Sequence, residues 1–113
     1  MKFDISNQNL TTLEGIEFPI GITELNCSLN KLTSLQYYPS SVQILHCSYN
    51  QLTSLQYCPP NLEVLYCWNN RLTSLLDCPP NIQSVYYYDN PLDEEYQNKS
   101  IKEITQINKI KYF

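Results

Sequence analysis

Hydrophobic and polar positions recur along this chain with a period of 20 residues. Three consecutive blocks align without gaps, at 32–51 (LTSLQYYPSSVQILHCSYNQ), 52–71 (LTSLQYCPPNLEVLYCWNNR) and 72–91 (LTSLLDCPPNIQSVYYYDNP). A fourth block, at 10–31, carries two extra residues before Pro19, and residues 1–9 end one more unit in the same register. A repeat of this length predicts stacked copies of one structural unit.

Each unit contains a short stretch in which apolar and polar residues alternate, as in Leu65-Tyr66-Cys67. Alternation with a period of two predicts a half-buried strand. Stacked units would place these strands in parallel, about 4.8 Å apart. Their inward Leu and Cys side chains would then form continuous columns that no single unit could bury alone.

Two further features predict how the chain leaves each strand and returns. Asn recurs just beyond the strand, and its amide can bond the turn backbone; Gln8 holds this position in the first unit, ahead of Asn30, Asn50, Asn70 and Asn90. The Pro-Pro pairs at 59–60 and 79–80 exclude helix and favour extended, polyproline-like return segments.

The repeat resembles the leucine-rich repeat family, whose pattern is L-x-x-L-x-L-x-x-N-x-L. Leu62, Leu65, Cys67, Asn70 and Leu72 meet it, and so do the equivalent residues at 22–32 and 42–52. The length and the LTSL…PPNL phrase are similar to the short bacterial subclass of YopM- and IpaH-type effectors, which is also seen in large DNA viruses. One departure is that Gln36, Gln56 and Leu76 stand where that subclass usually has Pro.

The resemblance covers about residues 3–92. It implies an α/β fold: a short solenoid with about five parallel strands on its concave face and extended return segments. We therefore divide the chain into a leucine-rich repeat array at 1–92, with repeats at 10–31, 32–51, 52–71 and 72–91 and a partial unit at 1–9, followed by a C-terminal cap at 93–113.

The tail changes character. Ser100 and Glu103 form a capping-box pattern at the start of a helix. Ile101, Ile104, Ile107 and Tyr112 then fall near helical spacing. Because an open solenoid needs a cover over its last unit, the pattern predicts a capping helix at about 100–110.

Composition and charge narrow the function classes. The formal net charge is −4, and the array holds 7 of the 11 acidic but only 3 of the 7 basic residues, which argues against a nucleic-acid partner. No apolar run approaches the roughly 20 residues of a membrane span, and residues 1–6 lack the apolar segment of a signal peptide. We expect a cytoplasmic protein, in the host cytoplasm if its origin is viral or that of an effector.

The five cysteines fall into two columns. Three occupy the inward strand position and two the apolar position before proline: Cys27, Cys47 and Cys67, then Cys58 and Cys78. Neither set has the C-x2-C spacing typical of zinc sites. We interpret them as reduced packing residues, with a metal site or disulfides as the alternative, and we expect no metal and no cofactor.

Catalytic residues are not predicted. His46 is the single histidine, and no nucleophile or carboxylate is paired with it in the sequence pattern. No glycine-rich phosphate loop is present. The sequence therefore predicts that the protein is not an enzyme.

The outward strand positions carry the most information about function. They are polar in the first two units and aromatic in the last two, where Tyr66, Trp68, Tyr86 and Tyr88 gather. Exposed Tyr and Trp are favoured at binding hot spots. The alternatives are that these rings only stabilise the sheet, or that the tail covers them.

The sequence thus predicts a protein-interaction module whose partner docks on the concave face. The predicted contact residues are Tyr66, Trp68, Tyr86 and Tyr88, with His46 and Tyr49 at the margin. Alternatives are a structural protein that self-associates through an uncapped N-terminal edge strand, or a fragment of a larger effector of the ubiquitin-ligase type. Accordingly we expect a monomer or a weak homodimer through that edge.

Overall fold

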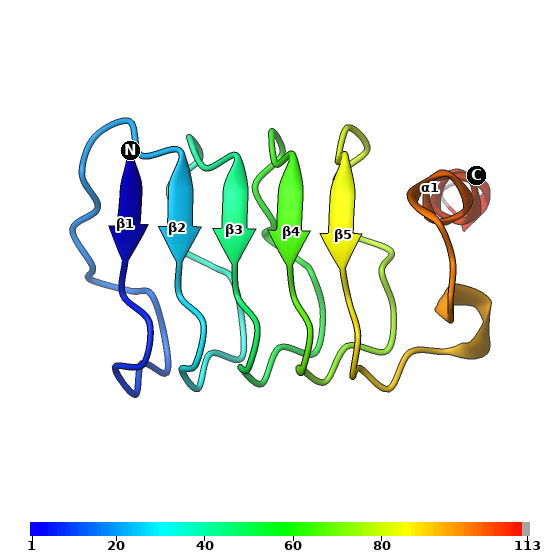
Figure 1. Cartoon of the computed structure of the whole chain (residues 1–113), viewed down its shortest axis with the longest axis horizontal. Coiled ribbons are helices and arrows are strands. Elements are labelled where there is room, and N and C mark those ends of the chain that lie inside the picture. Colours follow the sequence, from blue (N-terminus) through cyan, green and yellow to red (C-terminus); the bar gives the residue numbers. More distant parts are fainter. Residues whose placement is uncertain (112–113) are drawn as a thin grey trace.

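Five three-residue strands lie side by side in one parallel sheet, in the order of the sequence (Figure 1). They are β1 (Lys2–Asp4), β2 (Glu24–Asn26), β3 (Ile44–His46), β4 (Val64–Tyr66) and β5 (Ser84–Tyr86). The structure is a computed structural model that describes residues 1–111 of the chain. The strands pair in the register of the repeat, with Leu25 beside Leu45 and Leu45 beside Leu65. The predicted solenoid of about five parallel strands is confirmed.

The core consists of columns of equivalent residues from successive units. Leu25, Leu45 and Leu65 are each 0% exposed, and so are Cys27, Cys47 and Cys67 two positions later. Alternation along each strand sends these side chains to one face and their neighbours to the other. Stacking therefore buries a continuous apolar core that one unit alone could not form.

The asparagine column ties neighbouring units together. The Asn70 Nδ2 atom donates to the Cys67 carbonyl of its own unit at 3.1 Å and to the Cys47 carbonyl of the preceding unit at 3.0 Å. Its Oδ1 atom accepts from the backbone N–H of Leu52 at 3.0 Å. Gln8, predicted to replace Asn in the first unit, is instead exposed, and its backbone N–H donates to Asn30. The prediction for Gln8 is wrong. The side-chain amide of a ladder asparagine bonds carbonyls from its own unit and from the preceding one, and no strand precedes β1 in the sheet.

The return segments connect the strands through tight turns. In one of them the Cys58 N–H donates to the Leu55 carbonyl at 3.0 Å, and the third turn residue, Tyr57, has φ 68°. That conformation is typical of the third position of a type II turn and favours glycine, which the unit at 10–31 supplies as Gly15 (φ 80°). The sequence predicted extended segments here but not these turns.

The tail forms a 3₁₀ turn, η1 (Glu94–Tyr96), and a helix, α1 (Ile101–Lys111), beyond β5 at the C-terminal end of the sheet (Figure 1). The predicted capping box is present: the Ser100 N–H donates to Glu103, and the Glu103 N–H donates to Ser100. Asn108 is buried on α1 and donates to the Leu75 carbonyl at 2.9 Å. Tyr112, predicted to extend the apolar face, lies outside the described residues.

Candidate functional site

The strand register also aligns the outward side chains into columns, and we call this outward surface the strand face. It consists of the side chains of Lys2, Asp4, Glu24, Asn26, Ile44, His46, Val64, Tyr66, Ser84 and Tyr86, together with Trp68 and Tyr88 just beyond β4 and β5. Pairing places Asp4 beside Asn26, then His46, Tyr66 and Tyr86 along one column. This column is polar at its N-terminal end and aromatic at its C-terminal end, as the sequence predicted.

The aromatic end is a continuous stack. The rings of His46 and Tyr66 lie parallel, with centroids 4.5 Å apart and an interplanar angle of 3°. Tyr66 and Tyr86 follow at 4.8 Å and 6°. These spacings match the distance between neighbouring strands. Both faces of the Tyr66 ring are therefore covered, and its edge is what it can offer to a partner.

Trp68 completes this cluster. Its ring meets Tyr66 edge-on, at 5.7 Å and 89°, and the side chain is partly exposed. Edge-to-face and offset-stacked pairs of this kind stabilise aromatic clusters beyond the area that they bury. We call His46, Tyr66, Tyr86 and Trp68 the aromatic stack. The exposed parts of this cluster are ring edges and polar tips, together with the face of Tyr86 that points away from Tyr66.

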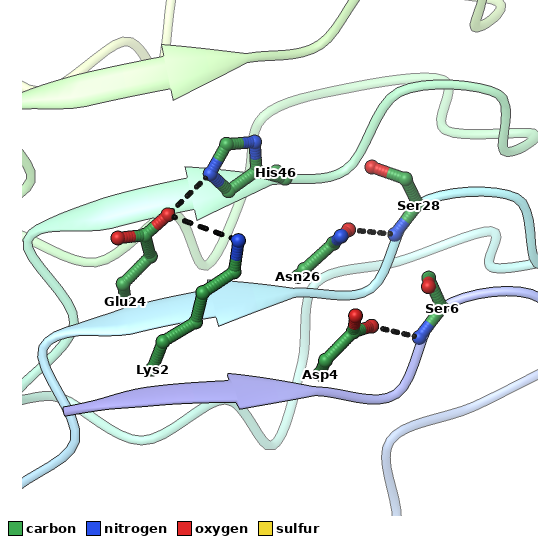
Figure 2. Close-up of polar contacts among 7 residues, drawn as sticks. All are labelled: Lys2, Asp4, Ser6, Glu24, Asn26, Ser28 and His46. Carbon is green, nitrogen blue, oxygen red and sulfur yellow. Dashed lines mark hydrogen bonds and ion pairs between the residues drawn. The ribbon is translucent and has the colours of Figure 1, made fainter.

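The polar end is organised around Glu24 (Figure 2). Its Oε2 atom lies 2.8 Å from His46 Nε2 and 3.7 Å from Lys2 Nζ. The hydrogen bond with His46, helped by the Lys2 ammonium, holds the pKa of the Glu24 carboxyl below its usual range against the opposing effect of burial. Glu24 therefore links the polar end of the strand face to the first ring of the aromatic stack.

The side chains of Asp4 and Asn26 are fixed by their own turns (Figure 2). Asp4 Oδ1 accepts from the Ser6 N–H at 2.9 Å, and Asn26 Oδ1 accepts from the Ser28 N–H at 3.0 Å. Hydrogen bonds from the side chain and backbone of Ser6 lower the pKa of the Asp4 carboxyl. These groups present fixed acceptors beside the ion pair.

Comparison with known proteins agrees with this geometry. A family model described as Leucine Rich Repeat matches residues 61–85. Among solved structures, YopM from Yersinia enterocolitica WA-314 is similar, with a TM-score of 0.59 and 33% sequence identity over 69% of this chain. The array is a leucine-rich repeat of the YopM-like type. No curated protein matches the sequence.

This leucine-rich repeat array corresponds to a small part of its structural relative. The matched region spans 17% of the YopM chain. Within residues 1–111, no helix of the leucine-rich repeat protein is long and apolar enough to cross a membrane.

The structure places the predicted contact residues of the leucine-rich repeat in two groups. His46, Tyr66, Trp68 and Tyr86 form the aromatic stack. Tyr88 is 64% exposed and pairs with the ring of Tyr87, at 6.1 Å, rather than with the stack. Tyr49 is 48% exposed on the turn after β3, where no ring contact joins it to the stack within the described residues. Four of the six are thus contiguous, and two lie apart.

Sequence reasoning missed the contact between Glu24 and His46. These residues stand 22 positions apart, in adjacent columns of neighbouring strands. The signal that could have found the pair is the repeat register itself, because diagonal neighbours on adjacent strands lie within reach of long side chains.

The cysteines of the repeat are free thiols, and all five lie in the described part of the chain. Burial raises the pKa of Cys27 and Cys78 to about 12 and raises that of Cys47, Cys58 and Cys67 as well. Thiols with raised pKa values stay protonated at neutral pH and react slowly, since the thiolate is the nucleophile and the metal ligand. Their environment is that of packing residues.

Proposed function

We propose that this protein is a protein-interaction module that binds its partner on the strand face, centred on the aromatic stack. The leucine-rich repeat fold is generally a non-enzymatic interaction scaffold, and an array of this type suits that role. The observation that carries the proposal is that His46, Tyr66, Tyr86 and Trp68 form one partly exposed cluster on a rigid sheet.

The cluster has the physical properties of a binding hot spot. Tyr and Trp supply large contact areas at a small cost in side-chain entropy, and each keeps a polar tip. The stack restrains these rings before binding, so little freedom remains to be lost on association. The Glu24 ion pair and the fixed acceptors of Asp4 and Asn26 would supply orientation at the other end of the surface.

A matched pair of variants tests the proposal. Trp68→Ala removes an outward ring from the strand face, whereas Tyr57→Ala removes a ring that is 48% exposed on a return segment. Each variant and the wild-type protein serve as bait for quantitative affinity capture. We expect some proteins to be captured by the wild type and by Tyr57→Ala but not by Trp68→Ala. The purified partner should then bind Trp68→Ala at least 2 kcal/mol more weakly than it binds the wild type, roughly the hot-spot threshold.

Trp68 also provides a direct optical readout. Because it is the sole tryptophan and is partly exposed, acrylamide should quench its fluorescence in the free protein and quench it less in the complex. Melting temperatures of both variants are measured alongside. Equal partner binding by Trp68→Ala and the wild type would place the interaction away from the aromatic stack.

Self-association through β1 is the second candidate. Among the described strands, β1 pairs with β2 alone, so its other edge has no strand partner. An antiparallel pair of β1 strands centred on Phe3 would bring Lys2 of one copy opposite Asp4 of the other, which is a favourable cross-strand pair. Sedimentation of the wild type and of the Lys2→Asp variant distinguishes this candidate, because only self-association predicts a dimer that the variant loses.

We also propose that the protein works in a reducing compartment such as the cytoplasm. The five free thiols support this part of the proposal.

A further inference from the structure

The exposed edge of β5 repeats a hydrogen-bonding pattern that every earlier strand uses. In the unit before it, the Cys67 N–H donates to the Tyr86 carbonyl and the Asn69 N–H donates to the Tyr88 carbonyl. The Glu63 carbonyl accepts from Gln83 and Ser84. Besides the ladder bonds within the strands themselves, each inner strand thus offers two donors and one acceptor, at fixed spacing, to the strand that follows.

The last unit presents the same three groups without a partner. By the 20-residue repeat they are the N–H groups of Tyr87 and Asp89 and the carbonyl of Gln83. Within residues 1–111, none of the three has a protein hydrogen-bond partner. Unpaired backbone groups at a sheet edge are a template for one more strand.

An apolar cavity of about 450 Å³ lies between the return segment of the last unit and α1, and Val85 is the β5 residue in its lining. Val85 from β5, Ile82, Cys78 and the α1 residues Ile101 and Ile104 contribute to its lining. Val85 is only partly buried, whereas its column neighbours Leu45 and Leu65 are fully buried. The inward face of the last strand is therefore incompletely covered by the cap.

The position of α1 determines what can occupy this space. The helix lies beyond β5, on the side where a sixth unit would continue the solenoid (Figure 1). It is anchored there by the bond from Asn108 to the Leu75 carbonyl and by the bond from Tyr96 to Asn108. A complete repeat unit, with its return segment, would compete with the helix. A single extended segment needs only the strand position and the cavity.

We propose that β5 binds an extended peptide segment of a partner protein as a sixth parallel strand. The segment pairs with the free groups of Tyr87, Asp89 and Gln83 and places alternate apolar side chains in the cavity next to Val85. Main-chain bonds to a sheet edge combined with pockets for alternate side chains are an established mode of peptide recognition. An aromatic residue on the outward side of the segment would stack on the face of Tyr86 that points away from Tyr66.

The chain's own repeat supplies the peptide that best fits this description. A synthetic peptide with the sequence of residues 62–69 (LEVLYCWN), carrying serine at the Cys67 position, repeats the strand that already pairs with β5. In the proposed register its Leu65 equivalent lies beside Val85 and its Tyr66 equivalent beside Tyr86. A control peptide is N-methylated at the two residues that donate to the Gln83 carbonyl, which removes those donors and keeps every side chain.

Amide hydrogen exchange of the intact protein gives the decisive readout. We expect the peptide to slow exchange at Tyr87 and Asp89, while the Asn69 amide, already bonded to Tyr88, changes little. The N-methylated peptide should bind at least tenfold more weakly. Val85→Arg, which places a charge in the cavity, should weaken binding by a similar factor, whereas Gln36→Arg, at an exposed position of a distant return segment, should not.

Three results would overturn the proposal. The first is no protection at Tyr87 and Asp89 when the peptide is raised to about 1 mM, the weak end of specific affinities. The second is peptide binding that Trp68→Ala abolishes and Val85→Arg leaves intact, because the peptide would then occupy the strand face. The third is self-association that Val85→Arg removes in the absence of peptide, which would make a second copy of the chain the occupant.

Discussion

Asn70 shows how one residue type at one position of the repeat holds two units together. The residue is 8% exposed, and its side-chain amide bonds the Cys47 and Cys67 carbonyls and the Leu52 N–H. These backbone groups sit where strands end and no ladder partner is available. The side chain therefore supplies the hydrogen bonds that a strand ladder would otherwise provide, at the same loop position of successive units.

We expect Asn70→Ala to destabilise the protein by about 1–3 kcal/mol for each buried group that it leaves unpaired. Urea denaturation measures the change. Asn61→Ala, on the exposed part of the preceding return segment, is the matched control and should cost less than about 0.5 kcal/mol. Similar costs for the two variants would show that the amide bonds contribute little.

The residue before each ladder asparagine has positive φ, and the chain fills this position with different side chains. Leu29 has φ 57° and is 52% exposed, while Asn69 has φ 58°. The left-handed conformation costs most residues roughly 1–2 kcal/mol, and asparagine tolerates it better. Leu29→Asn should therefore raise the free energy of unfolding by roughly 0.5–1 kcal/mol, and the reverse change, Asn69→Leu, should lower it by a similar amount. A melt in which both variants shift the same way would contradict this.

Glu24 gives the strand face a pH dependence. Its folded pKa lies below the ordinary value, so its ion pair stabilises the fold above the unfolded pKa and is lost as pH falls through the folded pKa. Because the carboxyl is partly exposed, we expect Glu24→Gln to cost less than about 1 kcal/mol at pH 7 and nothing once acid has protonated the carboxyl. Denaturant melts across pH 3–7, with the exposed Glu63→Gln as control, measure the difference.

At the scale of elements, α1 is held by few contacts and depends on its own capping. The capping box between Ser100 and Glu103 satisfies N–H groups at the helix start, and the Ile104 N–H donates to the Ser100 carbonyl at 2.9 Å. The helix then covers the last unit through Ile104 and Asn108. We therefore expect the local stability of α1 to be largely independent of that of the array.

Ser100→Ala tests that separation. Loss of the cap should fray the first turn of α1 and speed amide exchange at Ile104. Exchange at the inner ladder amide of Cys47, which donates to the Tyr66 carbonyl at 2.8 Å, should stay unchanged. Faster exchange at both amides would mean that helix and array open together.

At the scale of the whole molecule, stability should grow with the number of units. Contacts join each unit to its neighbours, so an added unit contributes its own stability and one more interface. We expect a variant with residues 52–71 duplicated in tandem to unfold at a higher urea concentration and with a larger m-value, because more surface is exposed on unfolding. Unchanged values would show that the inserted unit does not stack.

Features that repeat or carry a local signal were predictable from the sequence, and features set by single side chains or by the end of the array were not. The Leu columns, the parallel register and the capping helix were predictable because each repeats or has its own local signal, such as Ser100 with Glu103. The turn at Tyr57 and the exposed Gln8 were not, since tyrosine has no preference for positive φ and an end unit lacks one neighbour. The repeat register places Glu24 within reach of His46, but the rotamers of the two side chains decide whether they meet. The separation of Tyr88 from the stack likewise follows from its contact with Tyr87.

The strands run across the long axis of the molecule, with β1 and α1 at opposite ends (Figure 1). A mechanical force that pulls the two ends apart would therefore act along the hydrogen bonds between strands and load them one strand at a time. Such a geometry is mechanically soft, because the bonds open in sequence instead of sharing the load. Each opened unit of 20 residues would release roughly 65–70 Å of chain. Under tension this small protein would behave as an extensible tether that lengthens in nearly equal steps.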